Sequence, residues 1–407
     1  MSESERGRPI RALHVITGLA AGGAEEQLRL LAPRLADRGV MCEVAALYNA
    51  GQTAALLRAD GIPVHDLHTP AFGDPRAVLR LTRLIRSRRY DLVHTHLFRA
   101  GLHGRLAARL SGVRAVVHTE HSLNPRLLEG RERTRSVEML YRAGERLGTL
   151  TLAVSAATAG HVRELGVRPE RIRVLPCGID ATAVRFDPAA RRSLRDRHGY
   201  APDDLVVACV GRLVPAKRFH VAVEATARLA GELPGRRVRL VVIGDGPERA
   251  ALQEQALASL PGRALFTGEL PPSSVVGWLA AADLYASPSP EETFGLSVLT
   301  ALAAGLPVVY ADCPALDELR SPLRAARRVP AEPSAFHAAL AGFATPGRAG
   351  LPAADGRAAA QEDALAAARA YDVAGVADRL AEIYRELLRP HTYTARTDLP
   401  DRVGSPR

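Results

Sequence analysis

The most constraining feature of this sequence is a regular alternation of short β-rich runs with longer segments of helical spacing. One such segment is "AEEQLRLLAPRLADRG" at 24–39, in which apolar residues recur every three or four positions. This alternation is typical of βαβ units, in which helices cover both faces of a parallel sheet. The predicted strands lie at 11–17, 41–48, 91–96, 115–121, 149–155 and 171–176 in the first half, and at 205–211, 238–244, 263–270, 282–289 and 307–312 in the second.

The chain is long enough for two domains built from such units. Its 407 residues are about twice the usual size of one domain, and 47% hydrophobic residues suffice for two packed cores. The segment at 186–204 has few strand formers and two prolines, so it is the predicted junction. We therefore predict an α/β fold with two Rossmann-like doubly wound domains, at 10–186 and 204–370, joined by a linker at 187–203. Because ligands of open α/β sheets bind outside the carboxyl ends of the strands, a cleft between the domains is expected.

The two ends of the chain have other patterns. The run "YDVAGVADRLAEIYRELL" at 371–388 has amphipathic helical spacing, and we predict a last helix at 371–390. Residues 1–9 and 391–407 are predicted to be flexible. The start has no signal-peptide pattern, and no apolar run reaches the ~18 residues of a membrane span. A cytoplasmic location is therefore expected.

The net charge limits the classes of ligand that the chain can bind, and the cysteine spacing bears on disulfides and metal sites. A net charge of +10 suits nucleic acid, an anionic membrane surface or phosphorylated substrates. The chain has no zinc-finger spacing and only 4% aromatic residues, so no nucleic-acid partner is expected. Its four cysteines are far apart and form no CxxC pair, which predicts buried thiols and no metal site.

In the first half, polar residues follow the predicted strands. Gly22 and Gly23 form a turn before a helix whose first turn holds Glu25, and such a turn can offer amides to a phosphate. A simple tight turn is an equal alternative. "HTH" and "HTEH" each end an apolar strand, and a histidine there can orient a hydroxyl or transfer a proton near neutral pH. A structural histidine is the alternative for any single one; the histidines are His94, His96, His118 and His121.

In the second half, cations and glycines follow the strands. Lys217 is the only lysine among the 54 Lys and Arg residues, and with Arg212 it brackets a turn containing Pro215. A guanidinium and a compact ammonium together suit a diphosphate. The glycines of "GDGPER", Gly244 and Gly246, allow close backbone approach to a ligand.

The last motif of the second half is "SPEETFGLSVLTALAAGLPVV" at 289–309. Its amides from Phe294 through Gly295 to Leu296 precede a helical run and can point at an anion. Glu292 stands just ahead of them and can accept hydrogen bonds from sugar hydroxyls.

Taken in order, these motifs resemble the GT-B fold glycosyltransferases of family 4, the retaining glycogen-synthase-like group. The resemblance spans residues 10 to 390. The motifs that carry it are "GGAE" at 22–25, "DLVHTH" at 91–96, "VVHTEH" at 116–121, "VLPCGID" at 174–180, "GRLVPAK" at 211–217, "GDGP" at 244–247 and "EETFGLSVLTALAAGLPVV" at 291–309.

The resemblance implies a role for each matching position. Arg212 and Lys217 would hold the donor's diphosphate, Glu292 would touch the transferred sugar, and His121 would lie near the anomeric carbon. The donor is implied to be a nucleotide-diphosphate sugar, UDP-linked by preference, with no metal and no further cofactor. Transfer would retain the anomeric configuration by front-face attack, and the last helix would cross back to the first, acceptor-side domain. The implied catalytic residues are His121, Glu292, Arg212 and Lys217; the donor-binding residues are Gly22, Gly23, Arg212, Lys217, Gly244, Gly246, Glu292, Phe294, Gly295, Leu296 and Thr300; the acceptor-side residues are His96, His118 and Glu25.

The sequence departs from the family pattern at two positions. The family usually has a second glutamate eight residues after the first, where it commonly binds the ribose, but this chain has Thr300 there. A hydroxyl cannot supply the charge-assisted bidentate grip of a carboxylate. Cys177 replaces the asparagine of an "NGVD"-like turn, which adjusts a structural turn.

Several functions stay open at this point. The leading hypothesis is sugar transfer to a hydroxyl of a small natural product or of a lipid-linked or cell-envelope glycan. The alternatives are a catalytically silent relative that only binds sugar nucleotides, prompted by Thr300, and a related epimerase or phosphorylase. The arginine-rich stretch at 126–148 could rest on the inner face of an anionic membrane or receive a phosphorylated acceptor, and a solvated helix is the alternative. The sequence does not indicate the oligomeric state.

Overall fold

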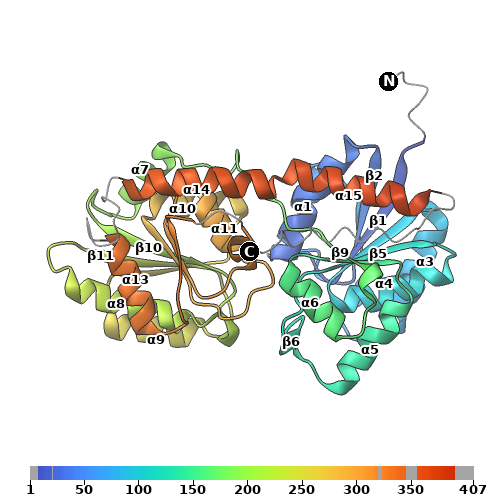
Figure 1. The fold of residues 1–407 in the computed structure, drawn as a ribbon, viewed down its shortest axis with the longest axis horizontal. Helices are drawn as coiled ribbons and strands as arrows, with labels where there is room; N and C mark the ends of the chain where they lie inside the picture. The colour runs from blue at the N-terminus through green and yellow to red at the C-terminus, as the bar shows by residue number, and fades with distance from the viewer. Residues whose placement is uncertain (1–7, 21, 320–322, 345–354, 390–407) are drawn as a thin grey trace, which may run out of the picture. The chain divides into compact units, whose positions relative to one another are not determined.

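A computed structural model describes residues 8–20, 22–319, 323–344 and 355–389, and it divides into two compact units. Unit 1 contains the chain up to Leu175 and again from Val376, and unit 2 runs from Pro176 to Gly375. In each unit, helices cover both faces of a parallel sheet (Figure 1). The predicted flexible ends, 1–9 and 391–407, lie outside the described residues except for positions 8 and 9.

Unit 1 has a seven-stranded sheet in the order β3-β2-β1-β4-β5-β8-β9, and all of its neighbouring strands are parallel. The strand order reverses between β1 and β4. The strands are β1 Ile10–Ile16, β2 Val40–Ala46, β3 Val64–Asp66, β4 Leu92–His96, β5 Ala115–Glu120, β8 Leu150–Ala153 and β9 Ile172–Val174; a small hairpin joins β6 Leu127–Leu128 and β7 Arg131–Glu132. The helices are α1 Gly23–Ala36, α2 Gln52–Ala59, α3 Pro75–Arg88, α4 Phe98–Leu110, α5 Arg135–Arg146, α6 Ala156–Glu164 and α15 Val373–Leu388.

Unit 2 has a six-stranded parallel sheet in the order β12-β11-β10-β13-β14-β15, which reverses between β10 and β13. Its strands are β10 Leu205–Val210, β11 Val238–Ile243, β12 Ala264–Gly268, β13 Leu284–Ser287, β14 Val308–Tyr310 and β15 Ala326–Arg328. Its helices are α7 Pro188–Arg197, α8 Phe219–Glu232, α9 Arg249–Ser259, α10 Pro272–Ala281, α11 Leu296–Ala303, α12 Pro314–Asp317, α13 Pro333–Ala344 and α14 Asp355–Tyr371.

The sheets form where the sequence is most apolar. β1 buries five consecutive residues at its carboxyl end, and every residue of β11 is buried. Such strands, covered on both faces, require helices on each side of the sheet. All eleven predicted strands are present, and the structure adds the short strands β3 and β15, which end the unit 1 and unit 2 sheets.

The predicted linker at 187–203 is wrong, because it contains α7, which packs against α10 in unit 2. Asp187 caps this helix by accepting from the Ala189 amide at 2.8 Å. The Arg191 guanidinium binds the Asp283 carboxylate at 2.6 Å, and the buried Arg195 donates to the Ala281 carbonyl at 3.0 Å. These arginines anchor α7 to the sheet, so the first unit ends at Leu175, before the predicted boundary at 186.

The last helix, α15, belongs to unit 1. Its residues Val376, Leu380, Ala381 and Tyr384 lie in the same hydrophobic core cluster as residues of β1, β2 and α1. The Arg385 guanidinium also donates to the Arg38 carbonyl at 2.6 Å, at the end of α1. The chain therefore returns to its first unit with this helix, as the family resemblance implied.

Two further predictions concern cysteines and membranes. Cys42, Cys177, Cys209 and Cys313 are free and buried, as predicted. Among the described residues, the helices lack the combination of length and apolar character that a bilayer span needs.

Candidate functional site

In unit 2, Lys217 and Glu292 meet where the strand order reverses. Lys217 follows β10 in a short 3-10 turn, and Glu292 follows the neighbouring strand β13. The Lys217 ammonium donates to a Glu292 carboxylate oxygen, forming an ion pair with side chains 27% and 13% exposed. A reversal of strand order is the position at which open α/β sheets bind ligands. The two predicted catalytic groups therefore lie together at this position.

Glycines let the loops after β10 and β11 pack backbone to backbone. The Leu213 amide donates to the Asp245 carbonyl at 2.9 Å, and the Glu248 amide donates to the Leu213 carbonyl at 3.0 Å. Gly244 and Gly246 have φ of 136° and 156°, and a Cβ on either would collide with the carbonyl oxygen of Gly211 or Leu213. The two predicted donor-binding glycines therefore hold the loop that carries Arg212 and Lys217 in place.

Arg212 lies on this loop with its side chain exposed. Among the described residues its guanidinium has no hydrogen-bond or ion-pair partner, in contrast to the ammonium of Lys217. A guanidinium in this state is accessible to an anionic ligand.

The amides predicted to assist a phosphate lie at the start of α11. Gly295 precedes the helix with φ of 88°, and a Cβ there would collide with the Cys313 sulfur. The Phe294 ring is buried and packs edge-on against Tyr371, with centroids 5.3 Å apart. The Leu296 amide begins the helix, where backbone N–H groups lack helical partners. Phe294 thus contributes its backbone here, because its ring belongs to the core.

Two neighbours shape this end of unit 2. The Glu292 amide donates to the Asp312 carboxylate at 2.7 Å, and burial raises the pKa of Asp312. The Thr300 hydroxyl donates to the Leu296 carbonyl one turn earlier at 2.8 Å, so its proton is already used within α11. The Thr300 hydroxyl oxygen can therefore only accept a hydrogen bond from a ligand.

In unit 1, adjacent strands bring four polar side chains into a hydrogen-bonded series, the imidazole row, defined as Cys42, His14, His96 and His121. Cys42 Sγ lies 3.6 Å from His14 Nε2, and His14 Nδ1 lies 3.0 Å from His96 Nε2. His96 Nδ1 lies 3.1 Å from His121 Nε2. The members come from β2, β1, β4 and the position after β5, which are consecutive in the sheet. The predicted acceptor-side His96 and the predicted catalytic His121 are therefore in direct contact.

Burial controls the charge of the row. It lowers the pKa of His14 and of His121 to about 4, and it places the pKa of His96 well below its usual value. It also raises the pKa of the Cys42 thiol to about 12. Near neutral pH the row therefore holds three neutral imidazoles and a protonated thiol.

His94 lies beside the row and has other partners. Its Nδ1 lies 2.5 Å from the Tyr384 hydroxyl of α15, and its Nε2 lies 2.7 Å from the Thr119 hydroxyl. Its ring stacks on that of His96, with centroids 4.3 Å apart and planes inclined by 27°. The last helix is thus bonded to the polar centre of unit 1.

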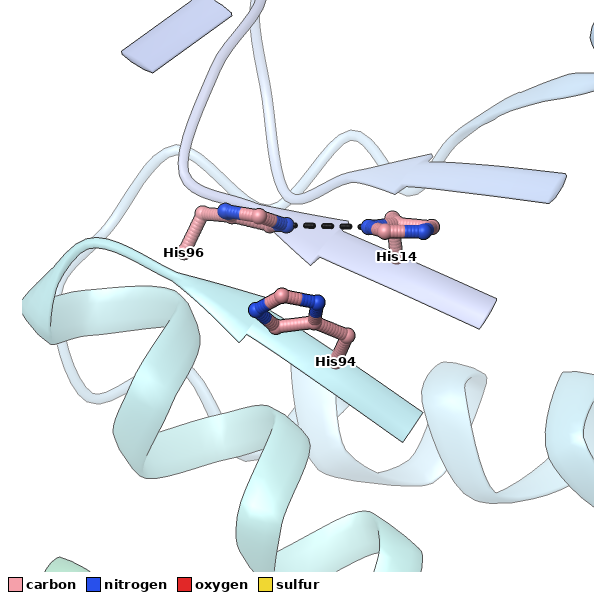
Figure 2. A group of neighbouring side chains, drawn as sticks. All are labelled: His14, His94 and His96. Carbon is pink, nitrogen blue, oxygen red and sulfur yellow. Dashed lines mark hydrogen bonds between the residues drawn. The ribbon is translucent and has the colours of Figure 1, made fainter. Parts of the chain in front are cut away.

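His14, His94 and His96 also form a candidate metal group, with nitrogen atoms within 4.8 Å of one another. Figure 2 shows His14 and His96 joined end to end, with the ring of His94 alongside. The facing nitrogens of His14 and His96 are already joined by a hydrogen bond of 3.0 Å. The nitrogens of His94 point to Tyr384 and Thr119 instead. The geometry therefore favours a hydrogen-bonded cluster over a metal site.

The other predicted residues of unit 1 are more scattered. His118 is fully buried, with Nδ1 2.9 Å from the Thr95 hydroxyl, so it has no surface to offer a ligand. It points away from the row, because it alternates with Thr119 and His121 along β5. Gly22 and Gly23 are exposed at the start of α1, and the Glu25 carboxylate folds back over Gly22.

Three residues of these clusters were missed in the sequence. His14 and Cys42 lie inside apolar strands, where the pattern predicts only core residues. Tyr384 lies on the buried face of a helix some 290 positions from its partner His94. The signal that could have found His14 is a histidine two residues before the end of an apolar strand whose last five residues are buried.

Comparison with known proteins gives matches to both halves of the chain. A family model described as Glycosyltransferase Family 4 matches residues 21–183, and one described as Glycosyl transferases group 1 matches residues 204–345. A D-inositol 3-phosphate glycosyltransferase of Nocardia farcinica is 33% identical over 323 residues, covering 72% of this chain and 70% of the relative. The same enzyme of Acidothermus cellulolyticus is 33% identical over 325 residues, with coverages of 72% and 70%.

Solved structures match the fold over nearly the full length. HepE of Anabaena, crystallised with UDP and glucose, has a TM-score of 0.79 at 23% identity and covers 93% of this chain and 100% of its own. Sucrose-phosphate synthase of Thermosynechococcus elongatus has a TM-score of 0.76 at 20% identity, with coverages of 93% and 99%. At such low identity these likenesses concern the fold, which is the GT-B arrangement of two parallel-sheet α/β domains.

Proposed function

The chain belongs to glycosyltransferase family 4 and is a glycosyltransferase of the GT-B fold, and on that premise we propose that it moves a sugar from a nucleotide-diphosphate sugar to an acceptor hydroxyl with retention of anomeric configuration. UDP is the preferred nucleotide of the proposal, since HepE was crystallised with UDP and with UDP-glucose.

The observation that carries this proposal is the Lys217–Glu292 ion pair at the reversal of strand order in unit 2. In the proposed complex, the diphosphate takes the Lys217 ammonium and the exposed Arg212 guanidinium as its cations. Glu292, released from its partner, accepts hydrogen bonds from sugar hydroxyls. The amides at the start of α11 add partial positive charge near the phosphates. These groups neutralise the leaving diphosphate by themselves.

The proposed chemistry is a front-face displacement. The bond between the anomeric carbon and the diphosphate oxygen breaks as the acceptor oxygen approaches from the same face. The leaving phosphate oxygen takes the proton of the acceptor hydroxyl, so no enzyme nucleophile is required. The protein lowers the barrier by placing fixed positive charge where negative charge develops.

For the acceptor, the relatives indicate a first candidate. Two that are 33% identical are named for D-inositol 3-phosphate, so we propose a phosphorylated polyol as the first acceptor to test. A lipid-linked glycan is the second candidate, because α5 exposes Met139 and Leu140 among its arginines. Co-sedimentation with anionic but not zwitterionic vesicles, lost on replacing both apolar residues by serine, would favour the lipid-linked acceptor and a location at the inner membrane face.

The central experiment is a donor panel assayed with purified wild type and variants. We expect transfer, or slow donor hydrolysis, with one nucleotide-diphosphate sugar and an unchanged anomeric configuration in the NMR spectrum of the product. Lys217→Ala should lower kcat about 100-fold or more, as loss of a transition-state charge contact does. Lys217→Arg should also be impaired, because a planar fork does not replace a compact ammonium.

Arg228→Ala provides the matched control, since this arginine pairs with Glu224 on the exposed side of α8. It should leave kcat unchanged. Binding of a sugar nucleotide without transfer or hydrolysis by the wild type would refute the proposed reaction and support a binding protein. Release of an epimer or of free sugar phosphate would refute it in favour of an epimerase or phosphorylase.

A further inference from the structure

The loop after β14 fixes the backbone of the loop after β13, on which Glu292 lies. The Glu292 amide donates to the Asp312 carboxylate at 2.7 Å, and the Ala315 amide donates to the Phe294 carbonyl at 2.9 Å. The first of these contacts uses a side chain, so a single substitution can remove it while the second contact remains. Asp312 is therefore the residue whose side chain holds the main chain of Glu292.

Arg328 orients the Asp312 carboxylate. This arginine ends β15, the neighbour of β14 in the sheet of unit 2. Its guanidinium donates to Asp312 Oδ1 at 3.2 Å, while Asp312 Oδ2 accepts the Glu292 amide. The same guanidinium donates to the Ala311 carbonyl at 3.2 Å and pairs with the Asp317 carboxylate at 3.1 Å. Three partners restrict the guanidinium to one orientation, and it thereby directs the other oxygen of Asp312 toward the amide.

These contacts join the carboxyl ends of four strands that are consecutive in the sheet. In the order β10-β13-β14-β15, the charged residues are Lys217, Glu292, Asp312 and Arg328. Two carboxylates, with side chains 13% and 20% exposed, therefore lie between two cations. Burial raises the pKa of Asp312, and the negative charges of Asp317 and Glu292 raise it further. Placing Asp312 here has an electrostatic cost, which is typical of functional sites.

We propose that Asp312 is a positioning residue that places Glu292 to meet the sugar of the donor, and that Arg328 orients Asp312 for this task. The inference rests on the proposed sugar transfer, in which the diphosphate takes Lys217 and Glu292 accepts hydrogen bonds from sugar hydroxyls. The contact with Asp312 uses the backbone amide of Glu292, so it persists when the carboxylate exchanges the lysine for the sugar. A displacement of about 1 Å in a positioning group can cost about 100-fold in rate.

The first test separates sugar-dependent from nucleotide-dependent binding. With the sugar nucleotide selected in the donor panel, Asp312→Ala should lower kcat about tenfold or more. The Kd of the matching nucleoside diphosphate, which has no sugar for Glu292 to bind, should stay within about twofold of wild type. Asp312→Asn should recover most of kcat, since its amide oxygen can still accept the Glu292 N–H.

Asp187→Ala is the matched control, because it removes another carboxylate–amide contact of unit 2, the 2.8 Å bond to the Ala189 amide at the start of α7. It should leave kcat and the Kd of the nucleoside diphosphate unchanged. If the affinity of Asp312→Ala for the nucleoside diphosphate falls as much as its kcat, the proposal is overturned, because the damage would then extend beyond the sugar.

A double-mutant cycle tests whether Asp312 acts through Glu292. In a Glu292→Ala protein, Asp312→Ala should lower kcat by less than about twofold, since the side chain that it positions is gone. An equal loss in both backgrounds would refute the proposal. Arg328→Ala should lower kcat about threefold in the wild-type background and should have no effect in Asp312→Ala. A loss that persists in Asp312→Ala would contradict the orienting role of Arg328.

The amide signal of Glu292 tests the positioning without any substrate, and so it distinguishes this proposal from the proposed sugar transfer. In protein labelled with 15N-glutamate, the signal is assigned by its absence in Glu292→Ala. We expect a downfield amide proton with slow hydrogen exchange in wild type and in Asp312→Asn, and an upfield shift with faster exchange in Asp312→Ala. An unchanged signal in Asp312→Ala would refute the positioning role. The expected shift in a protein that turns over no donor would refute the sugar transfer alone.

Discussion

Acid should destabilise unit 1 through His14, and the size of the effect can be worked from its burial. His14 is 1% exposed, and burial lowers its pKa from the ordinary 6.5 to about 4. Between these values the unfolded chain binds a proton that the folded chain does not. The contribution of neutral His14 to the free energy of unfolding is therefore fully present above about pH 7, and it is lost as the pH falls through 6.5 toward 4. One pKa unit corresponds to about 1.4 kcal/mol. Protonation of His14 should therefore lower the free energy of unfolding by about 3 kcal/mol below both pKa values, and by about 2 kcal/mol at pH 5.

The assay compares wild type with His14→Gln, which removes the titrating group and keeps a polar side chain. Urea unfolding followed by circular dichroism at pH 7.5 and pH 5.0 reports the free energy of unfolding of both units. The only tryptophan, Trp278, is buried in α10, so its fluorescence follows unit 2 and serves as the internal control. Between pH 7.5 and pH 5.0, the free energy of unfolding of unit 1 should fall by about 2 kcal/mol less in His14→Gln than in wild type. Equal losses in the two proteins would refute the reasoning.

Three further outcomes follow from the described contacts. Gly244→Ala, at φ of 136°, should displace its loop and weaken donor binding at least tenfold in a titration with UDP, whereas Gly231→Ala, whose added Cβ would meet open space, should not. Tyr384→Phe leaves a nitrogen of His94 without its 2.5 Å partner and should lower the free energy of unfolding of unit 1 by about 1–3 kcal/mol in urea titrations. Thr300→Glu should lower the donor KM about tenfold if a ribose lies against α11, and an unchanged KM would place the ribose elsewhere.

Much of the fold was predictable because its strands are strongly apolar and end in polar residues. The exceptions have physical causes. β3 and β15 are three residues long and carry charged residues, so no periodicity distinguishes them from loops. α7 resembles a solvated linker because of its arginines, but Arg195 is buried against carbonyl groups that only the folded sheet brings together.

The candidate site was predictable where residues follow neighbouring strands. Lys217 and Glu292 meet because β10 and β13 are adjacent, and His96 meets His121 because β4 and β5 are adjacent. The partners of these residues were not predictable. His14 appears as one more core position of β1, and only the strand order places its ring against that of His96.

The return of α15 to unit 1 has a consequence for the order in which the chain matures on the ribosome. Unit 2 ends at Gly375, so all of its strands and helices emerge before the last helix does. Unit 1, although its sheet is synthesised first, lacks Val376, Leu380 and Tyr384 in its core until α15 has emerged. Unit 1 is therefore begun before unit 2 and completed after it, and a nascent chain stalled shortly before α15 would leave the apolar face beside β1 and α1 open to chaperones.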